Sequence, residues 1–253
     1  MISELQKASM WKRISAAMFD AILLVIVVVG AAYLLSVVTG YDGYSQTVSE
    51  AYEKYEQQYG VIFELTAEEY AALSEEELAH YNEAYDALCR DEAAMYAYNM
   101  LVNLTLMVSS ISILLGYLVI EFAVPLLFGN GQTLGKKIFG IALMRTDEIR
   151  VTAPLLFIRT ILGKYTLETM IPVLICVMIY FNMAGLTAVL VLAAIALLQI
   201  ILIAATKTNS VIHDLLAKTV VVDFASQRIF GSEQELLEYK KKLHAERAAR
   251  QEY

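Results

Sequence analysis

The sequence predicts an all-α integral membrane protein with four transmembrane helices, an acidic helical extracellular insertion and a small cytoplasmic β-hairpin. Composition is the first reason, because 58% of the 253 residues are hydrophobic, and a soluble domain of this length would rarely be so apolar. The second reason is that the apolar residues gather in stretches long enough to span a bilayer. The third is that acidic and basic residues fall in different segments between those stretches.

Four stretches are apolar enough to be transmembrane helices. Three of them are long, namely Ile14–Val38, Tyr96–Phe128 and Gly185–Ala205. The fourth, Thr166–Asn182, contains Pro172 and is close to the lower length limit for crossing the hydrocarbon core. The chain therefore divides into six segments with the bounds 1–39, 40–95, 96–128, 129–165, 166–206 and 207–253.

The charges between these spans predict the orientation of the chain. Residues 40–95 contain fourteen acidic and two basic residues, a net charge of −12, whereas the rest of the chain carries seventeen basic and thirteen acidic residues, or +4. Because basic loops stay on the cytoplasmic side, we expect a multi-pass plasma-membrane protein with both termini and residues 129–165 in the cytoplasm. The acidic segment and the turn Phe181–Gly185 are then expected outside.

The acidic insertion is expected to be helical. Its aromatic and apolar residues recur at helical spacing at Tyr44, Val48, Tyr52, Tyr55 and Tyr59. Thr66 with Glu69 and Ser74 with Glu77 each match a capping box that opens a helix, and the second helix is expected to bend near Asp91. We interpret the acids as a solvated face, with a cation-collecting vestibule and a partner-binding surface as alternatives.

The cytoplasmic segments are expected to hold a hairpin and two amphipathic helices. The β-prone runs Ile138–Met144 and Ile149–Thr152 flank an acidic turn, and Lys218–Asp223 could add a third strand. Pro154 suits the first turn of a helix. The apolar residues after it alternate with Arg159, Lys164 and Glu168, which predicts an amphipathic helix in the inner membrane interface before the third span. Residues 207–253 are expected to end in an exposed basic helix, so membrane lipid is an expected partner.

Asp20 is the first candidate for a functional residue. It lies seven residues past Arg13, roughly 10 Å deeper along the first helix, where an ionisable group is costly. Glu121 and Gln199 are expected at a similar depth on the second and fourth spans, so the three side chains could meet. Two carboxylates that share a site disfavour double ionisation and could exchange a proton or bind a cation. Interhelical hydrogen bonding is the structural alternative.

Arg13 is expected to pair across the structure with Asp214, which lies just outside the membrane, and we interpret this as an ion pair that locks the fold. These residues carry a resemblance that also includes Gln132, Thr133, Gly135, Lys136 and His213. Together they resemble the RDD family of membrane proteins, which is named for one arginine and two aspartates, here Arg13, Asp20 and Asp214. The resemblance covers roughly Trp11–Phe224, and it implies a transport role without a settled substrate or mechanism.

One departure from the family concerns Glu148, which stands where the hairpin turn of the family commonly has glycine. Other chemistry is not indicated. Residues 132–137 lack the spacing of a P-loop, and His213 has no second histidine or cysteine at ligand spacing, so neither a cofactor nor a metal is expected. The unequal depths of Asp20 and Asp214 argue against a protease dyad, and we expect no enzyme activity and no nucleic-acid partner.

The expected function is proton- or cation-linked transport of a small solute or ion through Asp20 and Glu121. Four helices make a thin wall around a polar path, so a homo-oligomer is expected. The alternative is a non-transporting scaffold or membrane anchor that presents its external segment to a partner.

Overall fold

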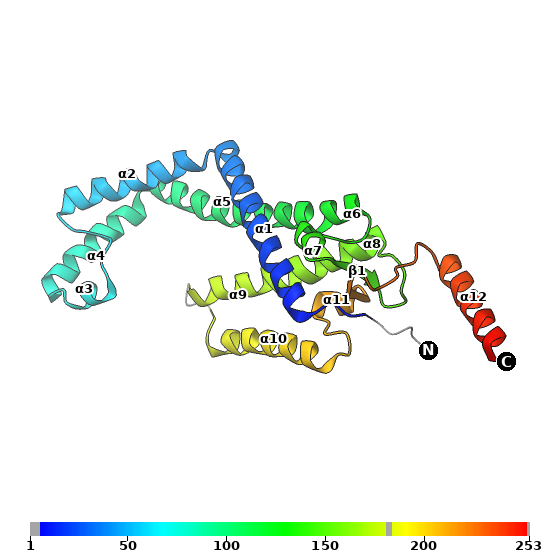
Figure 1. Cartoon of the computed structure of the whole chain (residues 1–253). Helices are drawn as coiled ribbons and strands as arrows, with labels where there is room; N and C mark the ends of the chain where they lie inside the picture. Colours follow the sequence, from blue (N-terminus) through cyan, green and yellow to red (C-terminus); the bar gives the residue numbers. More distant parts are fainter. Residues whose placement is uncertain (1–5, 181–183, 252–253) are drawn as a thin grey trace. The chain divides into compact units, whose positions relative to one another are not determined.

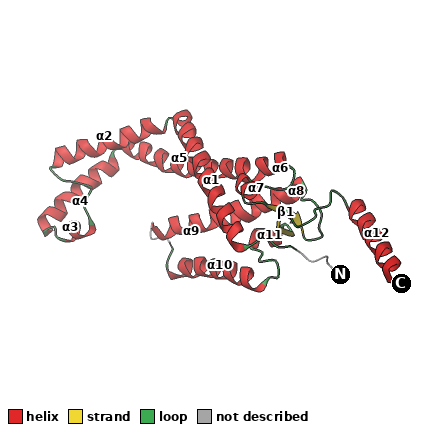
Figure 2. Cartoon of the chain, in the orientation of Figure 1, coloured by secondary structure: helices red, strands yellow, loops and turns green. Residues whose placement is uncertain are grey.

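The computed structural model describes residues 6–180 and 184–251, and helices dominate these residues (Figures 1 and 2). The predicted turn at Phe181–Gly185 falls mainly outside them. The chain forms two compact units, one made of Met1–Val28 with Ile113–Tyr253 and the other of Val29–Ser112. Among the described residues, four helices are long and apolar enough to cross a membrane. This agrees with the predicted all-α membrane protein.

The four long helices are built from labelled elements as follows. The first is α1 (Met10–Thr39), and the fourth is α10 (Leu186–Ala205). The second runs through α5 (Glu92–Tyr117), the π-helical segment η1 (Leu118–Ala123) and α6 (Val124–Phe128). The third runs through α8 (Ala153–Phe157), the π-helical segment η2 (Ile158–Met170) and α9 (Ile171–Tyr180).

The third long helix differs from the prediction, because no break separates an interfacial helix from a span. The backbone keeps right-handed helical angles at both junctions, Ile158 and Ile171. In η2 the hydrogen bonds shift to i→i+5, as from the Ile171 N–H to the Thr166 carbonyl. Arg159 and Lys164, whose charges suggested a water-facing side, are instead bound by buried carboxylates, so they do not need an aqueous interface.

The insertion folds into α2 (Tyr41–Tyr59), α3 (Ala67–Ala71) and α4 (Glu75–Arg90), with α2 and α4 side by side (Figure 1). Both predicted capping boxes are present, because the side chains of Thr66 and Ser74 accept from the amides three residues on. A core of alanine, leucine and aromatic side chains joins the helices, formed by Ala51, Leu88, Ala94, Tyr52, Tyr55 and Phe63. The predicted helical insertion therefore has a packed interior of its own.

The small sheet pairs β1 (Ile141–Arg145) with β2 (Thr219–Asp223) in antiparallel register, so that Leu143 faces Val221. The predicted third strand, Lys218–Asp223, is confirmed as β2 and makes most of the pairing with β1. Of the predicted local hairpin, the described residues keep one antiparallel bridge, between Met144 and Arg150. The valines of β2 are all buried, which favours this strand as the central partner, whereas the local run leads directly into α8.

The turn after β1 holds Glu148 in a left-handed conformation with φ of 71°. A residue with a Cβ is strained there by roughly 1–2 kcal/mol, which glycine avoids. We expect Glu148→Gly to raise the free energy of unfolding by about 1 kcal/mol. Thermal unfolding in detergent would measure it. Glu148→Ala is the matched control, because it removes the same carboxylate and keeps the strain. Equal stability of the two variants would contradict the expectation.

Three further helices complete the unit that contains the sheet. They are α7 (Leu134–Ile138), α11 (Ile212–Leu216) and α12 (Glu233–Gln251). The segment before α1 also joins β2, since the Ala8 N–H donates to the Val221 carbonyl over 3.2 Å. Ala16 of α1 is packed in one core cluster with Leu143 and Val221. The start of α1 is thereby held against the sheet.

Candidate functional site

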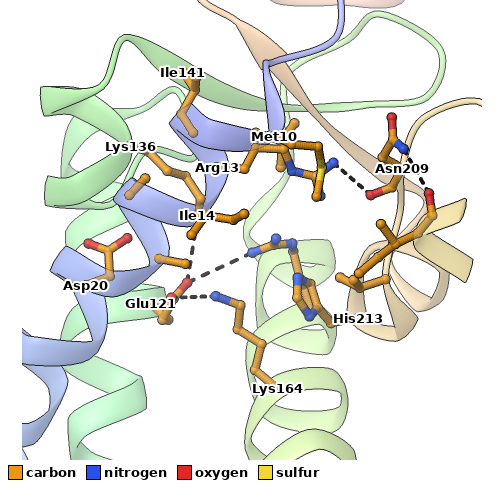
Figure 3. A pocket seen from close by; sticks show the side chains of 16 residues that line it. Met10, Arg13, Ile14, Asp20, Glu121, Lys136, Ile141, Lys164, Asn209 and His213 are labelled. Atoms are coloured by element: carbon orange, nitrogen blue, oxygen red, sulfur yellow. Dashed lines mark hydrogen bonds and ion pairs between the residues drawn. The ribbon is translucent and has the colours of Figure 1, made fainter. Parts of the chain in front are cut away.

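A cavity of about 270 Å³ lies among α1, η1, α7, η2 and the segment that leads into α11 (Figure 3). Its wall combines apolar residues with an unusual number of charges for the interior of a helical bundle. The charged side chains that line it are Arg13, Asp20, Glu121, Lys136, Arg159 and Lys164. Asp20 and Glu121, two of the three residues predicted to meet, therefore share one cavity.

Asp20 faces protein and is 4% exposed. Its Oδ1 accepts a hydrogen bond from the Gly135 N–H over 2.8 Å, and its Oδ2 accepts from the Thr133 hydroxyl. The Thr133 oxygen in turn accepts from the Lys136 N–H at 3.3 Å, which caps α7. The cost of placing a carboxylate at this depth is thus offset by donors from the start of α7. Asp20 thereby holds the start of α7, which is formed by the motif residues Thr133, Gly135 and Lys136.

Glycine is required at position 135 by the closeness of α1. A Cβ on this residue would overlap the Ala16 carbonyl oxygen and would lie 2.9 Å from Asp20 Oδ1. Gln132 supports the same loop from its other end, since its Nε2 donates to the Ile141 carbonyl over 2.9 Å. The short helix α7 is therefore fixed against α1 by direct backbone contact.

Glu121 is surrounded by positive charge. Its Oε1 lies 2.5 Å from Lys164 Nζ, while its Oε2 lies 3.7 Å from Lys136 Nζ and 4.0 Å from Arg159 Nη1. Figure 3 shows Lys164 directed at the Glu121 carboxylate. Among the residues that the structure describes, neither Glu121 Oε2 nor Arg159 Nη1 finds a hydrogen-bond partner, although both atoms are buried. Glu121 Oε2 can therefore still accept a hydrogen bond beside the cavity, and Arg159 Nη1 can still donate one.

Asp214 is fully buried behind this wall and contacts two arginines. Its Oδ1 accepts from Arg159 Nε at 3.1 Å and Nη2 at 2.9 Å, and its Oδ2 lies 3.3 Å from Arg13 Nη2. The Arg13 contact is the one that the sequence predicts. Arg13 Nη1 also donates to the carbonyl of Asn209 at 2.7 Å. Asp214 consequently ties the start of α1 to η2 and α11.

Gln199 does not join Asp20 and Glu121. Its Oε1 accepts from the Ile212 N–H over 3.3 Å, and it is absent from the cavity wall. The physical reason is that the first amides of α11 have no partner within their own helix, and the Gln199 side chain supplies one. The predicted meeting of three polar side chains is wrong for this residue.

Sequence reasoning missed Arg159 and Lys164 as members of the cluster and placed them on the polar face of an interfacial helix. Arg159 and Lys164 are five positions apart, a spacing that puts two side chains on different faces of an α-helix. The i→i+5 bonding of η2 brings residues at this spacing together, and π-helical turns often occur at functional sites. The sequence did offer a signal for this cluster, namely two basic residues five positions apart in an otherwise apolar helix.

His213 borders the cavity and bonds to Glu168 of η2 over 2.7 Å through Nδ1. Burial, with Arg159 as the nearest contributing cation, holds the pKa of His213 well below 6.5, so the ring is neutral near pH 7. Burial also lowers the pKa of Lys136 to about 8, because the attraction of Glu121 offsets only part of the desolvation. Within residues 6–180 and 184–251 no group of three or more potential ligands is placed to hold a metal ion.

The long apolar helices and the buried charged cluster define a helical, multi-span membrane protein. Residues 7–218 match the model of the RDD family, and the chain belongs to that family. Arg13, Asp20 and Asp214, which the family resemblance singles out, all lie in or directly behind the cavity wall. No curated protein and no solved structure matches the chain.

Proposed function

We propose that this membrane protein moves a small ion or solute across the bilayer in a proton- or cation-linked step that uses Asp20 and Glu121. The supporting observation is that two carboxylates from different helices line one cavity within apolar helices. Ionisable groups at such positions are costly and are typically retained for function. Glu121 Oε2 also has no hydrogen-bond partner, so it is available to a proton or a ligand.

The contacts suggest how a proton on Asp20 would affect Glu121. The ionised Asp20 holds the start of α7 through Thr133 and Gly135, and α7 carries Lys136, whose ammonium lies 3.7 Å from Glu121. Protonation removes the charge that strengthens both hydrogen bonds of Asp20. Asp20 then binds the start of α7 more weakly, and Lys136 on α7 neutralises the charge of Glu121 less well. The two carboxylates are thereby coupled through one short helix.

The proposal includes a plasma-membrane location with both termini in the cytoplasm and function as a homo-oligomer. The orientation is supported by the separation of charge between residues 40–95 and the other connecting segments. The oligomer is supported by the small number of spans, since four helices enclose a polar path poorly.

The second candidate function is a scaffold or anchor that presents the folded insertion to a partner. It is favoured by the compensation of each cavity carboxylate, because Asp20 has two donors and Glu121 has three nearby cations. Such a cluster could serve only to lock the fold.

Asp20→Asn separates the two functions. Asparagine can keep both contacts, with its carbonyl oxygen accepting from Gly135 and its amide donating to Thr133, so we expect little loss of stability. Proton-linked flux into proteoliposomes, measured with a pH-sensitive dye across a panel of monovalent cations and small solutes, should fall at least about tenfold.

Asp147→Asn is the matched control, since it neutralises a carboxylate that does not line the cavity and leaves the hydrogen bonds of Asp20 in place. We expect it to keep most of the flux despite a small loss of stability. Flux that survives in Asp20→Asn, or that is lost equally in both variants, would contradict the transport role of Asp20 and favour the scaffold.

A further inference from the structure

The cavity wall carries more positive than negative charge. Its lining side chains are four cations (Arg13, Lys136, Arg159 and Lys164) and two carboxylates (Asp20 and Glu121). Asp214 lies behind the wall and neutralises one of these cations, and the neutral His213 adds no charge. Glu168 also lies behind the wall, where it binds His213. On the wall itself four cations face two carboxylates, which is an unusual balance for a site that would bind a cation. An anion is the ligand that this field attracts.

Two of the cations have donors to spare. Arg159 has a side chain that is 2% exposed, and it directs Nε and Nη2 at Asp214, while Nη1 has no hydrogen-bond partner among the described residues. Lys136 Nζ lies 3.7 Å from Glu121 Oε2, which is longer than a hydrogen bond. Leaving a buried charged donor unbonded costs about 1–3 kcal/mol or more, so a ligand that accepts from these groups would gain that energy.

Half of the cavity lining is apolar. Half of the sixteen lining residues are methionine, isoleucine, valine or alanine, among them Met10, Ile14, Ile203, Val211 and Val221. At about 270 Å³ the cavity is smaller than the roughly 300–1,000 Å³ of sites for drug-sized ligands. It therefore suits a molecule of few heavy atoms that has one anionic end and one apolar end.

We propose that this cavity binds a small organic carboxylate, whose oxygens accept from Arg159 Nη1 and Lys136 Nζ and whose short tail lies against the apolar wall. The proposal rests on the proposed function and names its solute class. An inorganic anion would lose its hydration without gaining from the apolar surface. The nearest acid to the bound ligand is Glu121, and a second carboxylate beside it favours the uptake of a proton by the pair. Proton uptake on ligand binding would supply the proton link.

Binding to the full chain in lipid nanodiscs tests the proposal by titration calorimetry. The probes are sodium butyrate, sodium chloride and n-butylammonium chloride, which separate an organic carboxylate from an inorganic anion and from a cation of similar shape. We expect butyrate to bind and the other two salts to bind at least about tenfold more weakly. Comparable binding of chloride would overturn the organic class, and preferred binding of butylammonium would overturn the anion site.

Lys136→Gln is expected to weaken butyrate binding at least about tenfold. Lys137→Gln is the matched control, because the Lys137 ammonium lies 4.0 Å from the ring centre of Phe128 and the residue does not line the cavity. That variant should bind butyrate within about twofold of the unmodified chain. Equal affinity of the two variants would overturn the assignment.

Affinity for butyrate is also expected to fall as the pH rises through about 8, where Lys136 loses its proton. The groups that face Lys136 are Glu121 on η1, Arg159 and Lys164 on η2, and Asp20 on α1. The change therefore reports Lys136 together with the accompanying proton. An affinity that is constant between pH 6.5 and 9 would contradict the proposal.

Flux measurements keep the two hypotheses apart. Butyrate binding without any flux in proteoliposomes would contradict the proposed transport and support the binding site. Proton-linked cation flux without butyrate binding would support the transport and overturn the carboxylate site.

Discussion

Replacing Asp214 by asparagine is expected to lower the free energy of unfolding by about 3–5 kcal/mol. Asp214 is fully buried and accepts two hydrogen bonds from Arg159 and one from Arg13. Asparagine keeps the shape and one acceptor oxygen, but it removes the charge. Arg13 would then lose its ion pair, and Arg159, whose side chain is 2% exposed, would keep Glu121 at 4.0 Å as its counter-ion.

Unfolding in a mild detergent with added denaturant measures this loss. Asp147→Asn is the control, because Asp147 forms an exposed ion pair with Arg145, and such pairs contribute less than about 1 kcal/mol. A loss at Asp214 no larger than that of the control would show that the arginines find other partners, and it would contradict the role of Asp214 as the centre of the cluster.

The same geometry rules out a simple charge exchange as a test of the Arg13–Asp214 pair. The double variant Arg13→Asp with Asp214→Arg would place a new guanidinium next to Arg159, which shares Asp214 with Arg13. We therefore expect the exchange to leave the protein at least as unstable as the single variants, even though the pair exists.

Gly135→Ala is expected to destabilise the protein by about 3 kcal/mol and to reduce any activity that depends on Asp20. The added Cβ would overlap the Ala16 carbonyl oxygen and would lie 2.9 Å from Asp20 Oδ1. The Ala16 carbonyl belongs to the backbone of α1, so it cannot move away without shifting that helix. The start of α7 would have to separate from α1, and the hydrogen bond from the Gly135 N–H to Asp20 would lengthen.

Thermal unfolding checks this expectation, with Gly30→Ala as the control. Gly30 lies in the same helix as Asp20, and a Cβ there meets no atom within 4 Å. Alanine at that position should be neutral or stabilising by about 0.5–1 kcal/mol. Similar stability of the two variants would show that α7 is not tightly held against α1.

Local chemistry made much of the fold predictable. The apolar spans were visible in the sequence because a helix in lipid must be uninterrupted and uncharged for most of its length. The capping boxes at Thr66 and Ser74 were visible because a cap is satisfied within four residues. Asp20 stood out because its depth is costly, and the structure does surround it with protein donors.

Long-range pairing was not predictable in the same way. The sequence could not select β2 over the nearer Ile149–Thr152 run as the partner of β1, because both are β-prone and only burial distinguishes them. It also could not show that η2 is π-helical, which depends on the packing around that helix. For that reason Arg159 and Lys164 were assigned to the wrong environment, although their charges were evident.

The sequence by itself determined that this is a four-span helical membrane protein of the RDD family with a costly carboxylate in its first helix. These features depend on composition, on spacing along one helix and on a short motif. Only the tertiary structure decided which charges compensate one another, that Gln199 lies apart from the cavity, and that cations outnumber carboxylates around it. The reason is that electrostatic energy depends on distances between side chains from different helices, and these distances are set by how the helices pack.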